Sequence, residues 1–378
     1  MDFSKLREFQ DYLAGWRIPG NDCAVYKDGK EVYRHMAGYS DVERRLKICG
    51  SELYFFWSAS KIITTSLALR LHEEGRFKMT DPLSEYIPEF KNMSVRVTEG
   101  GKEEIIPASR EIEIRHLFNM TAGLDYNFNT LHINALRKST NNKCTAVDVA
   151  REIAKSPLTY EPGTHYNYSL CHDVLGAFIE VVTGKRLRDY AREVLFSPLG
   201  MTDTSYNLPS ESKMQRMAVQ YIWRDDLDKY IPTQNTCNHI LGSEYDSGGA
   251  GIISSLDDFI QFASCIACGG TAKNGYRYLS PSTIDLWRTN TLSTEQIKRD
   301  FKWPQLVGYG YGYGVRTMLH PEAVGSLSPI GEFGWDGAGG VTVIIDTNRR
   351  LALVYTQHML NSQQEYFFPK LRDALYSQ

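Results

Sequence analysis

Residues 54–75 read YFFWSASKIITTSLALRLHEEG, and this stretch predicts a helix together with a possible reactive pair. Its apolar side chains predict a helix from about Ser58 to Gly75 with apolar surroundings. Ser58 and Lys61 are three residues apart, so a helix places both side chains on one face, where the amine can accept the hydroxyl proton. Burial of Lys61 in this apolar surface would favour the neutral amine that such a role requires.

The same spacing occurs once more, at Ser210 and Lys213 in LPSESKMQR. That stretch is polar, so we expect Lys213 to be solvated and protonated there. Even at residues 58–61 a simpler interpretation exists, in which Ser58 caps the helix and Lys61 extends its stem along the surface. Spacing alone therefore does not decide whether the first pair is reactive.

Outward from this helix, strand signals appear near both ends of the chain. NDCAVYKDGKEVYRHMAGYSDV (21–42) predicts a hairpin whose turn contains Asp28-Gly29, because this dipeptide readily adopts positive φ. Residues 308–319 and 339–360 are also β-rich, with a turn at 346–349. GYGYGYGV (308–315) fits a strand better than a phosphate loop, since no helix follows it.

These signals predict an α/β (α+β) fold with one antiparallel sheet built from both termini and flanked by helices, since strands distant in sequence must share a core. Amphipathic helices are expected at residues 1–15 and 365–377. We expect a single catalytic unit over 1–378. Residues 1–75 plus 245–378 would form the sheet region and 76–244 a mostly helical insertion, with a cleft where the two meet.

Composition excludes several classes of function. The 378 residues include 42 basic and 45 acidic ones, and a net charge of −3 gives no field for nucleic acid or anionic lipid. No segment resembles an export signal or a membrane span, so we expect a cytoplasmic protein unless a cleaved leader preceded the chain. Cys265 and Cys268 fit one apolar helix face, and with no histidine motif we expect no metal and no cofactor.

Six segments, in order along the chain, resemble the serine β-lactamase and penicillin-binding-protein family, nearest to its class C β-lactamase-like and family VIII esterase branches. They are FFWSASKIITTSLALRLHEEGRFKMTDPLSEYIPEF (55–90), EIEIRHLFNMTAGLDY (111–126), EPGTHYNYSLCHDVLGAFIEVVTG (161–184), FSPLGMTDTSY (196–206), GGAGIISSLDDFIQF (248–262) and FGWDGAGG (333–340). The resemblance implies a β-lactamase/transpeptidase-like fold.

The resemblance also implies roles for individual residues. Ser58 would be the nucleophile that forms an acyl-enzyme, Lys61 the amine that activates it, and Tyr168 the phenol that exchanges protons with nucleophile and leaving group. The third motif, usually Lys-Thr-Gly or His-x-Gly, reads Trp335-Asp336-Gly337 here and would border the substrate on an edge strand. The backbone N–H groups of Ala338 and Ser58 would then form the oxyanion hole. The alternative for Tyr168 is a buried tyrosine with a satisfied hydroxyl. The alternative for GWDGAGG (334–340) is a tight turn.

Two departures from the family pattern favour ester or uncharged substrates. Leu170 stands where the family usually has an asparagine that binds a substrate amide, and Trp335 replaces a lysine or histidine that attracts a carboxylate. Both positions are expected to contact substrate. Tyr126, Glu244 and Tyr245 are further candidates for the mouth of the cleft.

Taken together, these observations predict a cofactor-independent serine hydrolase acting through an acyl-enzyme on Ser58, with a small-molecule ester, amide or peptide as partner. A D-amino-acid peptidase or carboxypeptidase, a β-lactamase and an acyltransferase remain alternatives. A non-catalytic sensor or binding module of the same fold is an alternative of another class. A Ser-His-Asp hydrolase is disfavoured because the chain has no G-x-S-x-G. The oligomeric state is not predicted.

Overall fold

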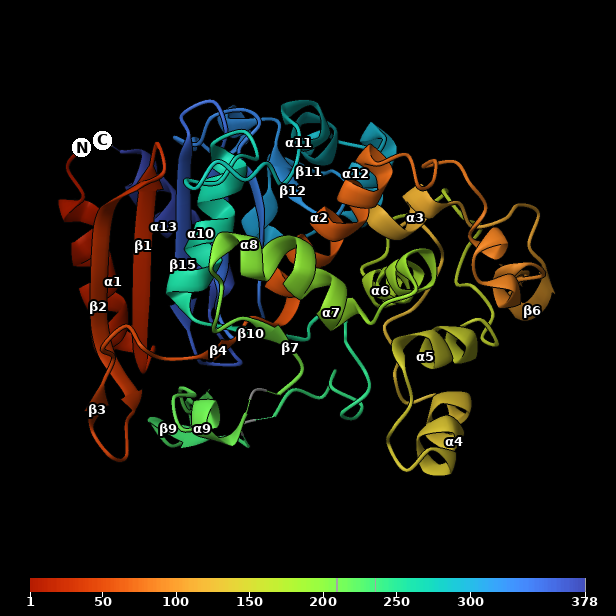
Figure 1. Ribbon diagram of the computed structural model, residues 1–378, viewed down its shortest axis with the longest axis horizontal. Helices are drawn as coiled ribbons and strands as arrows, with labels where there is room; N and C mark the ends of the chain where they lie inside the picture. Colours follow the sequence, from red (N-terminus) through yellow and green to blue (C-terminus); the bar gives the residue numbers. More distant parts are fainter. Residues whose placement is uncertain (209, 235, 378) are drawn as a thin grey trace.

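The computed structural model describes residues 1–208, 210–234 and 236–377 (Figure 1). Within them the main sheet has eight antiparallel strands. In spatial order they are β11 (Tyr309–Tyr311), β12 (Arg316–Met318), β13 (Phe333–Asp336), β14 (Thr342–Asp346), β15 (Leu351–Gln357), β1 (Gly20–Lys27), β2 (Lys30–Asp41) and β3 (Leu46–Lys47).

The two ends of the chain meet at the centre of this sheet, as the sequence predicts. β1 pairs with β15 from Asn21 opposite Gln357 to Lys27 opposite Leu351. β1 and β2 form the expected hairpin, and both turn residues, Asp28 and Gly29, have positive φ. The α/β fold with an antiparallel sheet built from both termini is therefore confirmed.

Helices cover both faces of the sheet. α10 (Leu256–Ala267) packs on β1, β14 and β15, while α1 (Ser4–Trp16) packs on β1 and β2 and lies beside α13 (Gln364–Tyr376). In Figure 1, α10 lies in front of the sheet and the two terminal helices lie behind it. α10 begins where the Ser255 side chain accepts a hydrogen bond from the Asp258 N–H.

The helix predicted from residues 54–75 is α2 (Ser60–Glu73), preceded by a 3-10 turn, η1 (Trp57–Ala59). Eleven of its fourteen residues are buried, which fits the apolar surroundings expected for it. It packs against α6 (Cys171–Thr183) and α11 (Pro281–Arg288). The other helices are α3 (Ile114–Phe118), α4 (Leu131–Ser139), α5 (Ala146–Ile153), α7 (Leu187–Ala191), α8 (Ser197–Leu199), α9 (Glu211–Met214) and α12 (Thr294–Asp300).

Short helical turns complete the connections. They are the 3-10 turns η2 (Leu83–Glu85), η3 (Pro88–Phe90), η5 (Pro304–Leu306) and η6 (Pro321–Ala323) and the π turn η4 (Arg192–Phe196). No helix in the described residues is long and apolar enough to cross a membrane.

The region 76–244 contains more strand than we predicted. It includes the hairpins β5–β6 (Ser94–Glu99, Lys102–Pro107) and β8–β9 (Tyr221–Arg224, Lys229–Pro232). Its β7 (Ser205–Tyr206) also joins β4 (Tyr54–Phe55) and β10 (Ile252–Ser254) in a three-stranded sheet. These strands are short, and several have a polar or exposed face, so period-two alternation gives little signal for them.

Residues 308–315 form one strand and a turn instead of one continuous strand. β11 ends at Tyr311, and Gly312 N–H bonds to the Val315 carbonyl. Gly314 has a φ of +97°, which glycine adopts easily and which reverses the chain into β12. The alternating glycines therefore build a hairpin at the edge of the sheet.

Candidate active site

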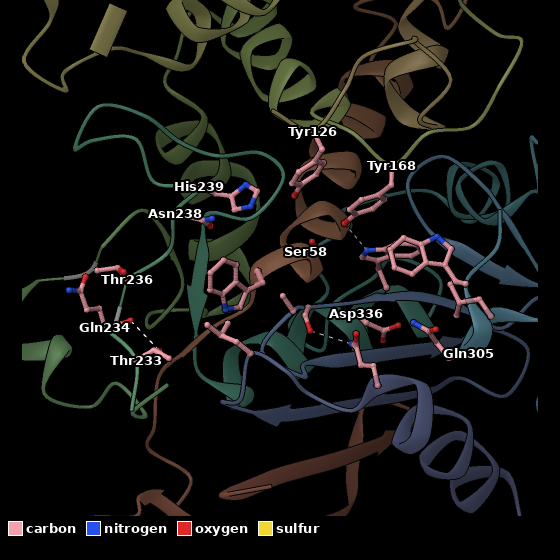
Figure 2. Close-up of a pocket in the computed structure, with 18 residues that line it drawn as sticks. Ser58, Tyr126, Tyr168, Thr233, Gln234, Thr236, Asn238, His239, Gln305 and Asp336 are labelled. Atoms are coloured by element: carbon pink, nitrogen blue, oxygen red, sulfur yellow. Dashed lines mark hydrogen bonds between the residues drawn. The ribbon is translucent and has the colours of Figure 1, made fainter. Parts of the chain in front are cut away.

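A cavity of about 620 Å³ is bordered by both the sheet region and the loops of region 76–244 (Figure 2). Its lining combines aromatic, aliphatic, neutral polar and small residues with one carboxylic acid: Trp57, Ser58, Tyr126, Tyr168, Thr233, Gln234, Thr236, Asn238, His239, Trp303, Gln305, Leu306, Trp335, Asp336, Gly337, Ala338, Leu360 and Gln364. Most residues predicted for the site therefore border one cavity.

Ser58 and Lys61 lie close together at the start of α2. Ser58 is in η1, and Lys61 is in the first turn of α2, so the three-residue spacing brings both side chains to the same face. Lys61 Nζ lies 3.2 Å from Ser58 Oγ and donates a 2.7 Å hydrogen bond to the Gly249 carbonyl. Lys61 is fully buried, whereas Ser58 borders the cavity.

The remaining neighbours of the Lys61 amine are aromatic faces. Nζ lies 4.6 Å from the ring centroid of Tyr168 and 5.7 Å from that of Tyr126. A carbonyl, a hydroxyl and two ring faces therefore surround an amine that is shielded from solvent. These contacts hold the amine beside Ser58 Oγ, within reach of its proton.

The loop that supplies the Gly249 carbonyl is fixed by a buried carboxylate. Asp173 Oδ1 accepts hydrogen bonds from Tyr245 Oη at 2.9 Å, Ser247 Oγ at 2.6 Å and Gly249 N at 3.3 Å. Thr64 Oγ1 of α2 donates to the neighbouring Gly248 carbonyl at 2.7 Å. The position of the Lys61 amine is therefore set from both α2 and the loop.

Tyr168 lies in an aromatic cluster on one side of the cavity. Its ring stacks on Trp335 at 5.6 Å and on Tyr126 at 5.6 Å, and it meets Trp303 edge to face at 5.6 Å. Trp335 Nε1 donates a 3.3 Å hydrogen bond to the Tyr168 hydroxyl. Tyr126, which we expected at the cleft mouth, does line the cavity.

The predicted Trp335-Asp336-Gly337 motif lies at the end of β13, which is an inner strand of the sheet rather than the edge strand we expected. β12 pairs only with Phe333 and Gly334, so Trp335 and Asp336 extend beyond it and reach the cavity. Gly337 and Ala338 follow in the turn before β14. A Cβ on Gly337 would lie 2.3 Å from the Phe56 carbonyl, so glycine permits the close approach of this turn to the residues before Ser58.

Asp336 joins the cavity wall to a buried arginine. Arg316 Nη1 lies 3.0 Å from Asp336 Oδ2, and Arg316 Nη2 donates to the Val343 carbonyl at 3.0 Å. Arg316 is fully buried, with its guanidinium 4.4 Å from the Phe368 ring centroid. Burial raises the pKa of Asp336 to about 6, against the opposing effect of Arg316.

Leu170 does not border the cavity. It precedes α6, is buried in the hydrophobic core, and donates its backbone N–H to the Asp125 carbonyl. An apolar leucine has no polar atom to keep in the cavity and packs into the core instead. Glu244 and Tyr245 also lie elsewhere, since Glu244 pairs with Arg186 and Tyr245 is buried against Asp173.

The other sequence motifs lie outside this cavity. Lys213 contacts Asp203 and the Thr202 carbonyl in a solvated setting, as expected for the second Ser-Lys pair. Cys265 is buried on α10 and Cys268 is half-buried, both as free thiols. The described residues contain no group of three or more metal-ligating side chains.

Sequence reasoning missed the conformation of Trp57 and the cavity side formed by Thr233, Gln234, Thr236, Asn238 and His239. Trp57 has a φ of +46°, which is rare for a bulky residue. Its indole Nε1 donates to Gln220 Oε1 at 3.2 Å, and its ring meets His239 edge to face at 6.1 Å. No sequence signal identifies a positive φ at a tryptophan, and residues 233–239 match no motif.

Comparisons with known proteins agree with this geometry. The family model described as Beta-lactamase matches residues 7–376. Protein Rv1367c of Mycobacterium tuberculosis (strain ATCC 25618 / H37Rv) is 29% identical, covering 89% of this chain and 85% of the relative. Esterase EstB of Burkholderia gladioli is 26% identical, covering 98% and 93%.

A solved structure has the same fold. EstCE1, described as a hydrolase with promiscuous acyltransferase activity, superimposes with a TM-score of 0.80 at 23% identity. The match covers 98% of this chain and 97% of EstCE1. The β-lactamase/transpeptidase-like fold predicted from the sequence is therefore confirmed.

The positive φ of Trp57 predicts an unusual order of stability. Trp57→Gly and Trp57→Ala both remove the indole, but only alanine retains a Cβ that opposes φ of +46°. We expect the glycine variant to be more stable by about 1 kcal/mol, measured by urea unfolding. At Trp303, where φ is −90°, we expect the alanine variant to be at least as stable as the glycine variant. If the glycine and alanine variants had the same order of stability at both positions, strain at Trp57 would be contradicted.

The pKa of Asp336 predicts a pH dependence of stability. Because this pKa rises from 3.8 to about 6 on folding, the carboxyl's favourable contribution is complete below about pH 4 and is lost as pH rises through about 6. Asparagine does not titrate. We therefore expect the unfolding free energy of wild type, relative to Asp336→Asn, to fall by up to about 3 kcal/mol from about pH 4 to pH 8.

Urea unfolding of both proteins across this range measures the difference, and other titrating groups cancel. A difference that stays constant, or that grows with pH, would mean that Arg316 stabilises the carboxylate by as much as burial costs.

Proposed function

Because the chain belongs to the β-lactamase family, we propose that it is a cofactor-independent serine hydrolase that cleaves esters through an acyl-enzyme on Ser58. The observation that supports this most directly is the fully buried Lys61 amine, 3.2 Å from Ser58 Oγ and among uncharged neighbours. In this proposal the amine acts as the base, because it lies within reach of the hydroxyl proton.

In the proposed acylation step, Ser58 Oγ attacks the ester carbonyl and its proton passes to the Lys61 amine. The new Oγ–C bond gives a tetrahedral oxyanion, which the N–H groups of Ser58 and Ala338 would stabilise. Ala338 is exposed to the cavity in the turn after β13, consistent with this role.

Collapse of this intermediate breaks the bond to the leaving alkoxide, which needs a proton. The Tyr168 hydroxyl would supply it, because the phenol borders the cavity and its ring is 4.6 Å from the Lys61 amine. The proton taken from Ser58 would restore Tyr168 through Lys61. Water then attacks the acyl-enzyme, with the same pair as base, and releases the acid and Ser58.

The cavity lining supports ester or other uncharged substrates. No lysine or arginine is among the described residues that line it, so a substrate carboxylate would find no cationic partner there. Leu170 is buried and offers no amide to a peptide-like substrate. These features weigh against a D-amino-acid peptidase and a β-lactamase, and the similarity to esterase EstB agrees with them.

Acyl transfer is the second candidate, because EstCE1 is described as a hydrolase with promiscuous acyltransferase activity. An alcohol that occupies the water position would accept the acyl group by the same steps. A non-catalytic binding module is the remaining alternative, and the following experiment distinguishes it.

Ser58→Ala should lower the turnover of p-nitrophenyl butyrate by more than about 1000-fold and abolish labelling by a fluorophosphonate probe, because the attacking oxygen is gone. Lys61→Ala should have a similar effect on turnover. Circular dichroism and a melting curve establish that each variant is folded.

The second Ser-Lys pair provides a matched control. Ser210→Ala should keep wild-type turnover, since its partner Lys213 is engaged with Asp203. Turnover that survives Ser58→Ala, or a wild type that neither hydrolyses nor is labelled, would overturn the proposed function.

Gly337→Ala tests the oxyanion turn. Its Cβ would lie 2.3 Å from the Phe56 carbonyl, so the turn must move away from η1 and the Ala338 N–H would be displaced. We expect kcat to fall about 10- to 100-fold with a smaller change in KM. Gly15→Ala, where a Cβ meets nothing within 4 Å, is the control and should keep full activity. An unchanged kcat in Gly337→Ala would remove this turn from the oxyanion hole.

A further inference from the structure

One side of the cavity has neutral polar groups without partners. We define this polar wall as Thr236, Asn238 and His239, all of which line the cavity. His239 is 8% exposed, and neither nitrogen of its ring makes a hydrogen bond within the described part of the chain. Thr236 and Asn238 are exposed at the cavity, and their side chains make no hydrogen bond within the described residues. A mostly buried imidazole that borders a cavity and has no partner favours a ligand that completes its hydrogen bonding.

The polar wall is uncharged. Burial lowers the pKa of His239 to about 4, so its imidazole is neutral near pH 7. Its ring is held edge to face by Tyr126 at 5.3 Å and Phe128 at 5.2 Å. The wall therefore suits a neutral group that both donates and accepts hydrogen bonds.

Trp57 connects the polar wall to the nucleophile turn. Gln220 accepts from the Trp57 indole N–H and donates through Nε2 to the carbonyls of Thr236 at 3.1 Å and Gln234 at 3.4 Å. Trp57 holds this position with a φ of +46°, directly before Ser58. The strained residue thus fixes the wall relative to the reacting hydroxyl, a use of strain typical of functional sites.

The arrangement of the cavity assigns its two sides to different parts of an ester. Tyr168, which would protonate the leaving group, lies against Trp335 and Trp303, so the leaving group lies on that side. Figure 2 shows His239 and Asn238 on the other side of Ser58 from Asp336 and Gln305. The acyl group would then extend toward the polar wall.

Building on the proposed function, we infer that the polar wall is an acyl-group subsite, and that it selects acyl groups carrying a neutral hydrogen-bonding substituent such as a hydroxyl. A plain alkyl group of the same size would leave the mostly buried His239 ring without a hydrogen-bond partner. Sites built to bind a hydroxyl discriminate strongly against analogues that lack it.

Two esters with one leaving group test this inference: p-nitrophenyl 3-hydroxybutanoate and p-nitrophenyl 3-methylbutanoate, in which a methyl group replaces the hydroxyl. The measurement is the ratio of their kcat/KM values, each divided by the rate of hydroxide hydrolysis. We expect wild type to favour the hydroxy ester by at least about tenfold, and His239→Phe, which keeps an aromatic ring, to lose most of that preference.

Asn238→Leu gives a second measurement at an exposed position, where folding is less at risk, and should also lower the ratio. Gln305→Leu removes a polar side chain on the opposite side of the cavity and should leave the ratio unchanged. A wild-type ratio near one, or a ratio that falls in Gln305→Leu but not in the two wall variants, would overturn the subsite. A wild type that hydrolyses neither ester and is not labelled by a fluorophosphonate would instead refute the proposed function itself.

Discussion

The site depends on one buried amine, Lys61 Nζ, held between Ser58 Oγ at 3.2 Å and the Gly249 carbonyl at 2.7 Å. A lysine side chain in water would be mobile and would not keep this position. The surrounding structure removes this mobility. α2 supplies the amine from a fully buried position, and the loop ordered by Asp173 supplies the carbonyl.

Strands from the two ends of the chain pair and complete the sheet. This pairing brings the Trp335-Asp336-Gly337 segment to the cavity beside this amine. β1 and β15 pair at the centre, and β14 and β13 follow outward until β13 runs past its short partner β12. The buried pair of Arg316 and Asp336 then fixes the end of β13 beside η1. Burying both charges is costly, and such pairs often contribute more to a unique arrangement than to stability. Here that arrangement places the turn at Gly337 against Phe56.

The sequence predicted the features that depend on residues close together in the chain or on a repeating pattern of residue types. Ser58 and Lys61 follow from helical spacing, the hairpin at Asp28 follows from turn chemistry, and the sheet closure follows from strands at both ends. The neighbours of Lys61 across the fold were not predictable, because Gly249 is almost two hundred residues away and offers only a carbonyl. Leu170 shows the converse. The resemblance predicts that this position contacts substrate, but leucine has no polar group and its side chain lies in the core.

The strain at Trp57 explains why the two sides of the cavity differ. If the residue before Ser58 were small, Gln234 and Thr236 would lose the bridge through Gln220 that links them to the nucleophile turn. On the opposite side, the rings of Tyr168, Trp303 and Trp335 need no such bridge, because they pack against one another, stacked or edge to face. Aromatic packing is rigid and favours apolar groups, whereas the bridged loop presents neutral polar side chains to the cavity. In the proposed function, a substrate with one apolar end and one neutral polar end would satisfy both sides at once, and the contacts of Trp57 would hold the polar side in place.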